Sequence, residues 1–215
     1  MKKLLSLVLA LALCASFTLA LSSCTEEEAK EIFENLTKEE WQQALAAPNF
    51  ENVTINYEYT NEGILTKQIA KFTKDGVYRK MESFGTDGKS NGDSMALYFE
   101  GEEATQQRNL FLQTFLAIVE DRDNFEYNET TKLYTAKSAE ARIEQSEAIY
   151  ITEKMKDGKL AFNKEGNVDT FECNLSETIY MNNEVMQSVT IDVTWTFSNY
   201  GTTTITAAEK ESKAN

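Results

Sequence analysis

The residues whose spacing most resembles a catalytic motif are Gly88-Lys89-Ser90-Asn91-Gly92, which match the G-x-S-x-G pattern of a nucleophile elbow. An elbow requires a helix directly after the serine, and the residues after Ser90 have no helical pattern. The chain contains no histidine, so no imidazole can accept the Ser90 proton. The same residues end like a phosphate-binding loop, but Ser83 stands where that loop needs its first glycine. The sequence therefore predicts no nucleophile at Ser90.

Metal chemistry is poorly supported by the residue types. Without histidine most zinc and iron sites are excluded, and the cysteines are too few for a thiolate cage. No D-x-[DN]-x-[DN]-G loop for calcium occurs. Paired carboxylates could hydrolyse glycosides, but among 35 acidic residues some pairs lie close by chance. We expect no metal and no cofactor, and keep a carboxylate-based hydrolase only as a third hypothesis.

The N-terminus has the order of a secretion signal. Lys2 and Lys3 precede an apolar segment over residues 4–21, and Leu21-Ser22-Ser23-Cys24 is followed by an acidic run. The ending resembles the bacterial lipobox. That resemblance implies cleavage before Cys24, a diacylglyceryl group on its sulfur, and a lipid-anchored protein on the extracytoplasmic face of a bacterial membrane. The alternatives are an ordinary secretory peptide cut after Ser22 and a transmembrane anchor, which lacks a stop-transfer flank.

Charge limits the partners of the mature chain. Removing Lys2 and Lys3 from 21 basic residues leaves 19 against 35 acidic residues, a formal net charge of −16. Nucleic acid is excluded as a partner, because binding phosphates requires a cationic surface. Anionic lipid headgroups are repelled too, so we expect the domain to stand off the membrane on its tether.

The chain divides into a signal peptide (1–23), a flexible acidic tether (24–36), a single domain (37–206) and a disordered tail (207–215). About 170 residues are enough for one hydrophobic core. Of the three cysteines, Cys14 leaves with the leader and Cys24 is lipidated, so Cys173 has no partner. We predict that Cys173 is a buried, unreactive side chain.

The first half of the domain begins with a helix and continues with strands. Thr37 and Glu40 form a capping-box pattern, which predicts a helix over 38–47 that ends at Pro48. Asp75-Gly76 favours a type I′ hairpin between two of the strands. Alternating apolar residues predict strands at 53–59, 65–73, 77–84 and 94–99.

A second, longer helix is predicted over residues 101–119. Its apolar arc is wide, because Phe111 and Ile118 lie beside the stripe that contains Phe115 and Leu116. A helix with such an arc is buried on more than one side, so we expect it to lie against the concave face of a sheet.

The second half consists of further hairpins. Residues 125–127 and 132–135 predict a small one, residues 138–145 are ambiguous between helix and loop, and residues 149–162 predict a hairpin that turns at Asp157-Gly158. That turn would place Met155 opposite Leu160.

The last hairpin, over residues 168–197, is the most informative. A two-residue turn at Asn182-Asn183 would pair apolar with polar positions, so we predict a three-residue loop that includes Glu184. An asparagine would take the left-handed position. The resulting register pairs Phe171 with Trp195, Cys173 with Val193, and Leu175 with Ile191.

These elements define an α+β domain, in which a curved antiparallel sheet, or half-barrel, wraps around an apolar helix with a short N-terminal helix beside it. The element order over residues 37–206 resembles the LolA-like or LppX-like superfamily of bacterial lipoprotein carriers. Local echoes lie in Asp75-Gly76-Val77-Tyr78, Lys156-Asp157-Gly158-Lys159-Leu160 and Phe197-Ser198-Asn199-Tyr200-Gly201-Thr202-Thr203.

The resemblance implies lipid or lipoprotein carriage and supplies no catalytic residues. If the helix and sheet separate enough to hold an acyl chain, the lining residues are Phe111, Phe115, Leu116, Val193 and Trp195. The first hypothesis is thus a non-catalytic, membrane-anchored protein that binds an apolar ligand. The alternative is an interaction or sensor domain with a filled core that binds another envelope protein.

Overall fold

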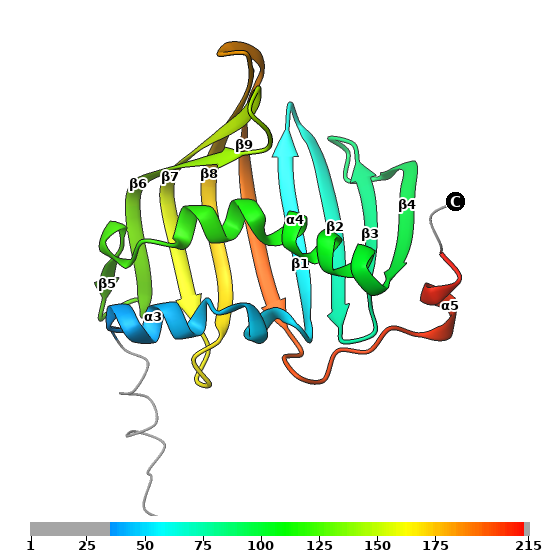
Figure 1. Ribbon diagram of the computed structural model, residues 1–215, viewed down its shortest axis with the longest axis horizontal. Coiled ribbons are helices and arrows are strands. Elements are labelled where there is room, and N and C mark those ends of the chain that lie inside the picture. Colours follow the sequence, from blue (N-terminus) through cyan, green and yellow to red (C-terminus); the bar gives the residue numbers. More distant parts are fainter. Residues whose placement is uncertain (1–34, 213–215) are drawn as a thin grey trace, which may run out of the picture.

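The computed structural model describes residues 35–212, which form one nine-stranded antiparallel sheet crossed by a long helix (Figure 1). The strands are β1 (Val53–Asn61), β2 (Ile64–Thr73), β3 (Gly76–Phe84), β4 (Ser90–Glu100), β5 (Glu126–Asn128), β6 (Leu133–Glu144), β7 (Ile149–Phe162), β8 (Val168–Met181) and β9 (Glu184–Ser198). The helices are α3 (Lys38–Ala44), α4 (Gly101–Val119) and α5 (Ala207–Lys210), with short 3-10 turns η1 (Ala47–Phe50) and η2 (Arg122–Asn124).

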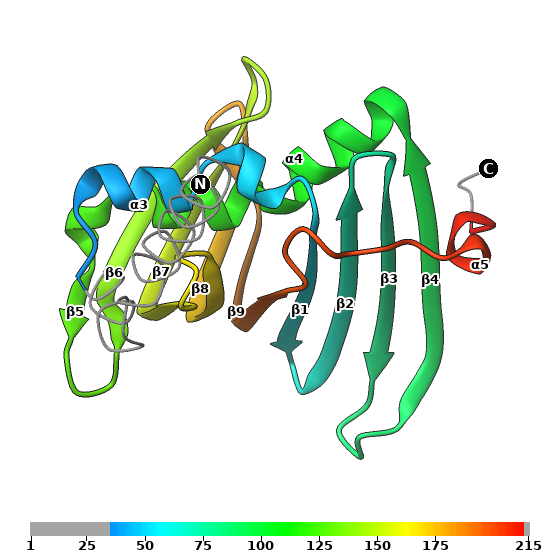
Figure 2. The ribbon, with the colours of Figure 1, turned by 90° about the horizontal axis from the view of Figure 1, so that it is seen from below.

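The predicted α+β class, with an antiparallel sheet against an apolar helix and a short N-terminal helix, is confirmed. The strand order is β4-β3-β2-β1-β9-β8-β7-β6-β5, and the sheet is neither closed nor strongly curled. A half-barrel would enclose α4, whereas here the sheet lies on one side of it. Both α3 and α4 lie on the same face (Figure 2).

The topology requires a long crossing helix. β4 and β5 form opposite edges of the sheet, and α4 is the main element of the chain that connects them. With 19 residues it spans about 28 Å, which is close to the width of six or seven strands at about 4.8 Å each. Its bounds agree with the prediction, and it buries Ala104, Leu112, Phe115, Ile118 and Val119.

The helix α3 covers one end of the same face. The predicted capping box is present, because Thr37 accepts from the Glu40 amide while the Glu40 side chain accepts from Thr37. Trp41 is fully buried, and its indole Nε1 donates to the Val119 carbonyl at 2.8 Å, which fastens α3 to the end of α4. The helix ends earlier than predicted, at Ala44, and Pro48 lies instead in η1.

The register of the last hairpin is confirmed, but the predicted loop is wrong. Phe171 pairs with Trp195 and Leu175 with Ile191, as expected from burial. The loop has only two residues, Asn182-Asn183, and both have positive φ (51° and 66°), as a type I′ turn requires. A β-bulge supplies the missing residue: Ile179 pairs with Gln187 and Tyr180 with Val185, so Met186 between them is the extra one.

The predicted turn at Asp157-Gly158 is also wrong, because β7 runs through it. Lys156 pairs with Asn174 and Lys159 with Glu172, so two residues of β7 oppose one of β8. Asp157 adopts φ 53°, the left-handed geometry that a turn would use, within a bulge. Of the ambiguous residues 138–145, those up to Glu144 belong to β6, which pairs with β7, and the small hairpin of β5 with β6 is confirmed.

Two expectations near the β4 edge need correction. Thr73 pairs with Gly76, and neither intervening residue is among those with positive φ, so the turn is not type I′. Gly76 is required by close packing instead, since a Cβ there would lie 2.6 Å from the Tyr98 Oη.

The predicted disordered tail forms α5 over residues 207–210, because Glu209 pairs with Lys71 at 2.6 Å and the Tyr98 amide donates to the Ser212 carbonyl.

Candidate ligand-binding groove along α4

The predicted lining residues fall into two groups. Phe115, Val193 and Trp195 belong to the core, and the ring of Phe115 packs 5.6 Å from Phe171 and 6.1 Å from Trp195. Close ring packing leaves no space for a chain between the helix and the sheet there. Leu116 lines another cavity, of about 360 Å³, on the other side of α4, beside Leu45.

A groove does open along the opposite edge of α4. In Figure 1 no helix of residues 35–212 lies over the part of the sheet above α4. Its volume is about 210 Å³. Of the predicted residues, Phe111 and Trp195 line it. The full lining is Tyr57, Gln68, Arg79, Leu110, Phe111, Thr114, Leu175, Glu177, Val189, Ile191 and Trp195.

The floor of the groove is aromatic. Tyr57 stacks on Trp195 with ring centroids 4.8 Å apart, and the Tyr59 ring lies 5.4 Å from that of Tyr57. Phe111 of α4 contacts Tyr57 edge-on at 6.2 Å. Burial raises the pKa of the Tyr57 hydroxyl well above its ordinary value. These rings are rigid apolar surfaces, suited to hold an alkyl chain or another flat apolar group.

An arginine lies at one end of the groove. Arg79 donates to the Gln107 side chain at 2.9 Å and lies over the Phe111 ring at 5.3 Å. With its oxygen turned toward the guanidinium, Gln68 accepts from Arg79 Nε at 2.9 Å and from Nη2 at 2.7 Å. Loss of solvent lowers the pKa of Arg79. Within residues 35–212 no carboxylate forms an ion pair with it, so its charge is balanced only by amide oxygens and a ring face.

Two carboxyl groups lie at the other end. Glu153 and Glu177 are cross-strand partners on β7 and β8. Glu153 is fully buried; its Oε1 accepts from the Thr114 hydroxyl at 3.0 Å, while its Oε2 has no hydrogen-bond partner. Burial, and next the neighbouring Glu177 charge, raise the pKa of Glu153 to about 7. Because Glu153 has no exposed surface, the pair offers little to a hydrolase, which needs both carboxyls at its substrate.

The sequence contains a signal for this pair that our interpretation missed. Along β7 and β8, inward positions alternate with outward ones, and Glu153 lies between the inward residues Ile151 and Met155. A glutamate at an inward position of an alternating strand is unusual, because a buried charge is costly without a partner.

Cys173, in contrast, is buried and unpaired as predicted, and burial raises the pKa of its thiol to about 12.

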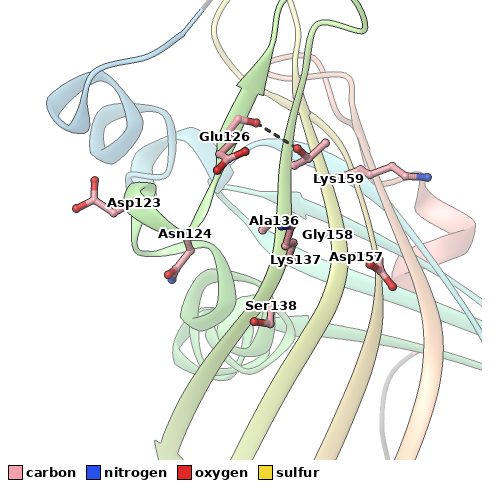
Figure 3. Close-up of a pocket in the computed structure, with 10 residues that line it drawn as sticks. Asp123, Asn124, Glu126, Ala136, Lys137, Ser138, Asp157, Gly158 and Lys159 are labelled. Atoms are coloured by element: carbon pink, nitrogen blue, oxygen red, sulfur yellow. Dashed lines mark hydrogen bonds between the residues drawn. The ribbon is translucent and has the colours of Figure 1, made fainter.

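A second cavity, of about 490 Å³, lies beside the β7 bulge (Figure 3). Apart from Ala136 and Gly158, its lining residues are exposed. The hydroxyl of Thr135 donates to the Glu126 carbonyl at 3.4 Å, and Lys159 pairs with Glu172 at 3.7 Å. Its charged groups are solvated or paired, so this cavity has fewer features of a binding site than the groove.

The motif at Ser90 does not form a nucleophile elbow. Ser90 begins the edge strand β4, is exposed, and accepts a hydrogen bond from the Gly92 amide at 3.2 Å.

Among residues 35–212 no group of three or more acidic or cysteine side chains is placed to hold a metal ion. No helix in that range combines the length and apolar character needed to cross a membrane. The lipobox residues Leu21, Ser22, Ser23 and Cys24 lie outside the described part of the chain.

Fold and groove together define a single-sheet α+β domain with one crossing helix and an aromatic-floored groove along it. Comparison of the chain with known protein families found no matching family model. Comparison with curated proteins found no match.

Proposed function

We propose that this protein is a non-catalytic, lipid-anchored protein of the extracytoplasmic face of a bacterial membrane, and that the groove along α4 binds the apolar part of a lipid or other acyl-bearing ligand. The observation that carries the proposal is the aromatic floor formed by Tyr57 and Trp195. These stacked rings border an open groove, whereas the core next to them is filled by side chains. Tyr57 and Phe111 are partly exposed beside this volume, and partly exposed aromatic side chains at an open groove are typical of an interaction site.

The size of the groove defines how the ligand is bound. Sites that enclose a whole small molecule measure about 300–1,000 Å³. At about 210 Å³ the groove holds part of a ligand, and the rest extends over the sheet beyond α4. The resemblance to LolA-like and LppX-like carriers implies a curved antiparallel sheet that wraps apolar helices. This chain shares the antiparallel sheet and the crossing helix but not the strong curvature, and the shared part supports carriage of an acyl-bearing molecule.

Native mass spectrometry tests the proposal on protein expressed in a lipid-rich bacterial host without residues 1–24, so that anchor lipid is not counted. Wild-type protein should retain bound apolar molecules. Val189 lines the groove, and Val189→Trp should fill it and abolish retention. Its exposed neighbour Thr190 does not line the groove, so Thr190→Trp is the matched control and should retain them. Ligand-free wild-type protein, or equal retention by Val189→Trp, would refute binding in the groove.

The anchor is tested separately. Two acyl chains at about 0.8 kcal/mol per buried methylene give a gross affinity on the order of 20 kcal/mol. Cys24→Ser should therefore move the full-length protein from the membrane fraction to the soluble fraction. Unchanged fractionation would refute the lipoprotein assignment and leave the groove unaffected.

One observation favours the alternative of an envelope protein-interaction domain. Exposed apolar side chains gather at the tip of the β8–β9 hairpin, where Met181, Val185 and Met186 are 40%, 59% and 59% exposed. The Met186 bulge lies in this tip. Such a patch on an extended hairpin suits contact with another protein. Ligand-free wild-type protein in the mass spectrometry experiment would favour this alternative.

A further inference from the structure

The carboxyl pair at the end of the groove lacks a counter-charge. Neither Glu153 nor Glu177 forms an ion pair within residues 35–212. The residue that faces Glu153 from β6 is Ala141, and the one that faces Glu177 from β9 is Val189, so neither neighbouring strand supplies a cation. A buried carboxylate without a cation is costly.

Glu177 and Glu153 have different access to the groove. Glu177 lines it together with Thr114, whereas Glu153 is fully buried beside Glu177 and holds the Thr114 hydroxyl at 3.0 Å. Glu153 does not line the groove itself; it lies behind the wall, as the cross-strand partner of Glu177. A positively charged group at Glu177 would neutralise the single negative charge that the pair carries while Glu153 keeps its proton.

We propose that this end of the groove binds the ammonium group of an amphipathic amine, with Glu177 in contact with the cation, Glu153 as its buried partner, and the alkyl part of the ligand on the Tyr57–Trp195 floor. The proposal rests on the proposed function of the groove and specifies the class of ligand. It is carried by the position of Glu177 at the groove wall beside Glu153, by the lack of an ion pair at either group within residues 35–212, and by the adjoining aromatic faces. Ammonium groups are attracted both by carboxylates and by ring faces.

A metal ion suits the pair less well than an ammonium group. Hard divalent cations take six or more oxygen ligands, and no cluster of three acidic side chains exists in the described residues. Arg79 lines the groove from β3, so cation binding is favoured only at the Glu177 end. The other polar groups that face this end are the Thr114 hydroxyl from α4 and the Tyr57 hydroxyl from β1.

Binding should displace a proton. Burial and the Glu177 charge keep the pKa of Glu153 near 7, so at pH 6 the pair holds a proton that a bound cation would expel. No bond is formed or broken apart from this O–H ionisation, and the proton passes to the buffer. The affinity for an ammonium ligand should therefore rise by up to about tenfold per pH unit below pH 7 and level off above it.

Isothermal titration calorimetry tests the proposal with three probes of one chain length: octyltrimethylammonium, 1-octanol and octanoate. The wild-type protein should bind the ammonium probe at least about tenfold more tightly than 1-octanol, and octanoate most weakly. Glu177→Gln should remove the preference for the cation and leave 1-octanol binding unchanged. Glu172→Gln is the matched control, because Glu172 lies on β8 with its side chain 54% exposed and pairs with Lys159; it should preserve the preference.

Proton release in two buffers of different ionisation enthalpy provides a test on the wild-type protein, independent of how the variants fold. Release on binding the ammonium probe at pH 6, and none on binding 1-octanol, would support the proposal. Equal affinity for the ammonium probe and 1-octanol would overturn the ammonium site but would still be consistent with binding of apolar ligands in the groove. An unchanged preference in folded Glu177→Gln would overturn it too. If none of the probes bound, both the proposal and the groove function would fail.

Discussion

The two ends of the sheet face that α4 crosses differ although they belong to the same strands. At one end α3 and η1 form a second layer, and their residues Trp41 and Phe50 have no exposed surface. At the other end the face has no second layer, and Tyr57 and Phe111 remain half-buried beside the groove.

The difference lies in the inward-facing residue types. The covered end is filled by aromatic and aliphatic side chains, with rings such as Phe50 and Phe197 packed 5.8 Å apart. The uncovered end places Arg79, Glu153 and Glu177 on the same face. Inward charges on the strands themselves contribute little to a core, so these three favour a role other than stability for this end of the sheet.

The largest expected effect contrasts one phenylalanine from each end. Phe50→Ala should lower the free energy of unfolding by about 3–5 kcal/mol, because the fully buried ring leaves a cavity. Phe111→Ala should cost about 1–2 kcal/mol, because its half-buried ring already faces open volume. Urea unfolding measures both. Equal costs would show that the two ends are packed alike and remove the basis of the comparison.

The next effect concerns pH. The pKa of Glu153 is about 7 in the folded protein and near 4.5 in the unfolded chain, so between these values the folded state binds more protons. This group's contribution to the free energy of unfolding should then fall by on the order of 3 kcal/mol as pH rises from about 4.5 to 7.

Glu153→Gln tests this contribution, because the amide keeps the shape and does not ionise. The variant should gain stability relative to wild type at pH 7.5, and the gap should close toward pH 4.5. Urea midpoints at both pH values measure it. If the difference in stability between the variant and wild type widened on acidification, the Glu153 carboxyl would be stabilised as an anion. That result would contradict the claim that Glu153 and Glu177 have no counter-charge.

The smallest effect on stability should come from Leu110→Ala. Leu110 lines the groove but is 56% exposed, so its removal should cost less than about 0.5 kcal/mol. The same change should weaken binding of an alkyl probe several-fold, since it removes apolar contact area. Thermal unfolding and probe titration give the two values; a change in stability without a change in binding would place Leu110 outside the ligand site.

Sequence alone predicted the parts of the fold that burial specifies strongly. The bounds of α4 and the pairing of Phe171 with Trp195 followed from apolar periodicity, because slipping by one residue would expose the core face. Asp157-Gly158 was misread because a hairpin turn and a bulge use the same left-handed geometry. The choice between them depends on β8, which is distant in the sequence and pairs along the whole of β7.

The candidate site was harder to predict than the fold. Phe111 and Trp195 were identified as lining residues because aromatic residues stand out in any apolar pattern. Glu153 and Glu177 were passed over, since their closeness depends on the β7–β8 register, and the bulge in β7 sets part of that register. The groove exists because α4 is the only helix of the described residues that contributes to its lining, an arrangement that no local pattern in the sequence specifies.

The most direct test of the account is a methyl NMR titration of the wild-type protein with 1-octanol. Shifts should be confined to Leu110, Leu175, Val189 and Ile191 at the groove, with the methyl group of Leu45 beside the covered end unaffected. Val189→Trp should abolish the shifts and Thr190→Trp should preserve them. Shifts centred on Leu45 and Leu116, or none at any methyl group, would contradict the claim that the uncovered end of the sheet is the ligand site.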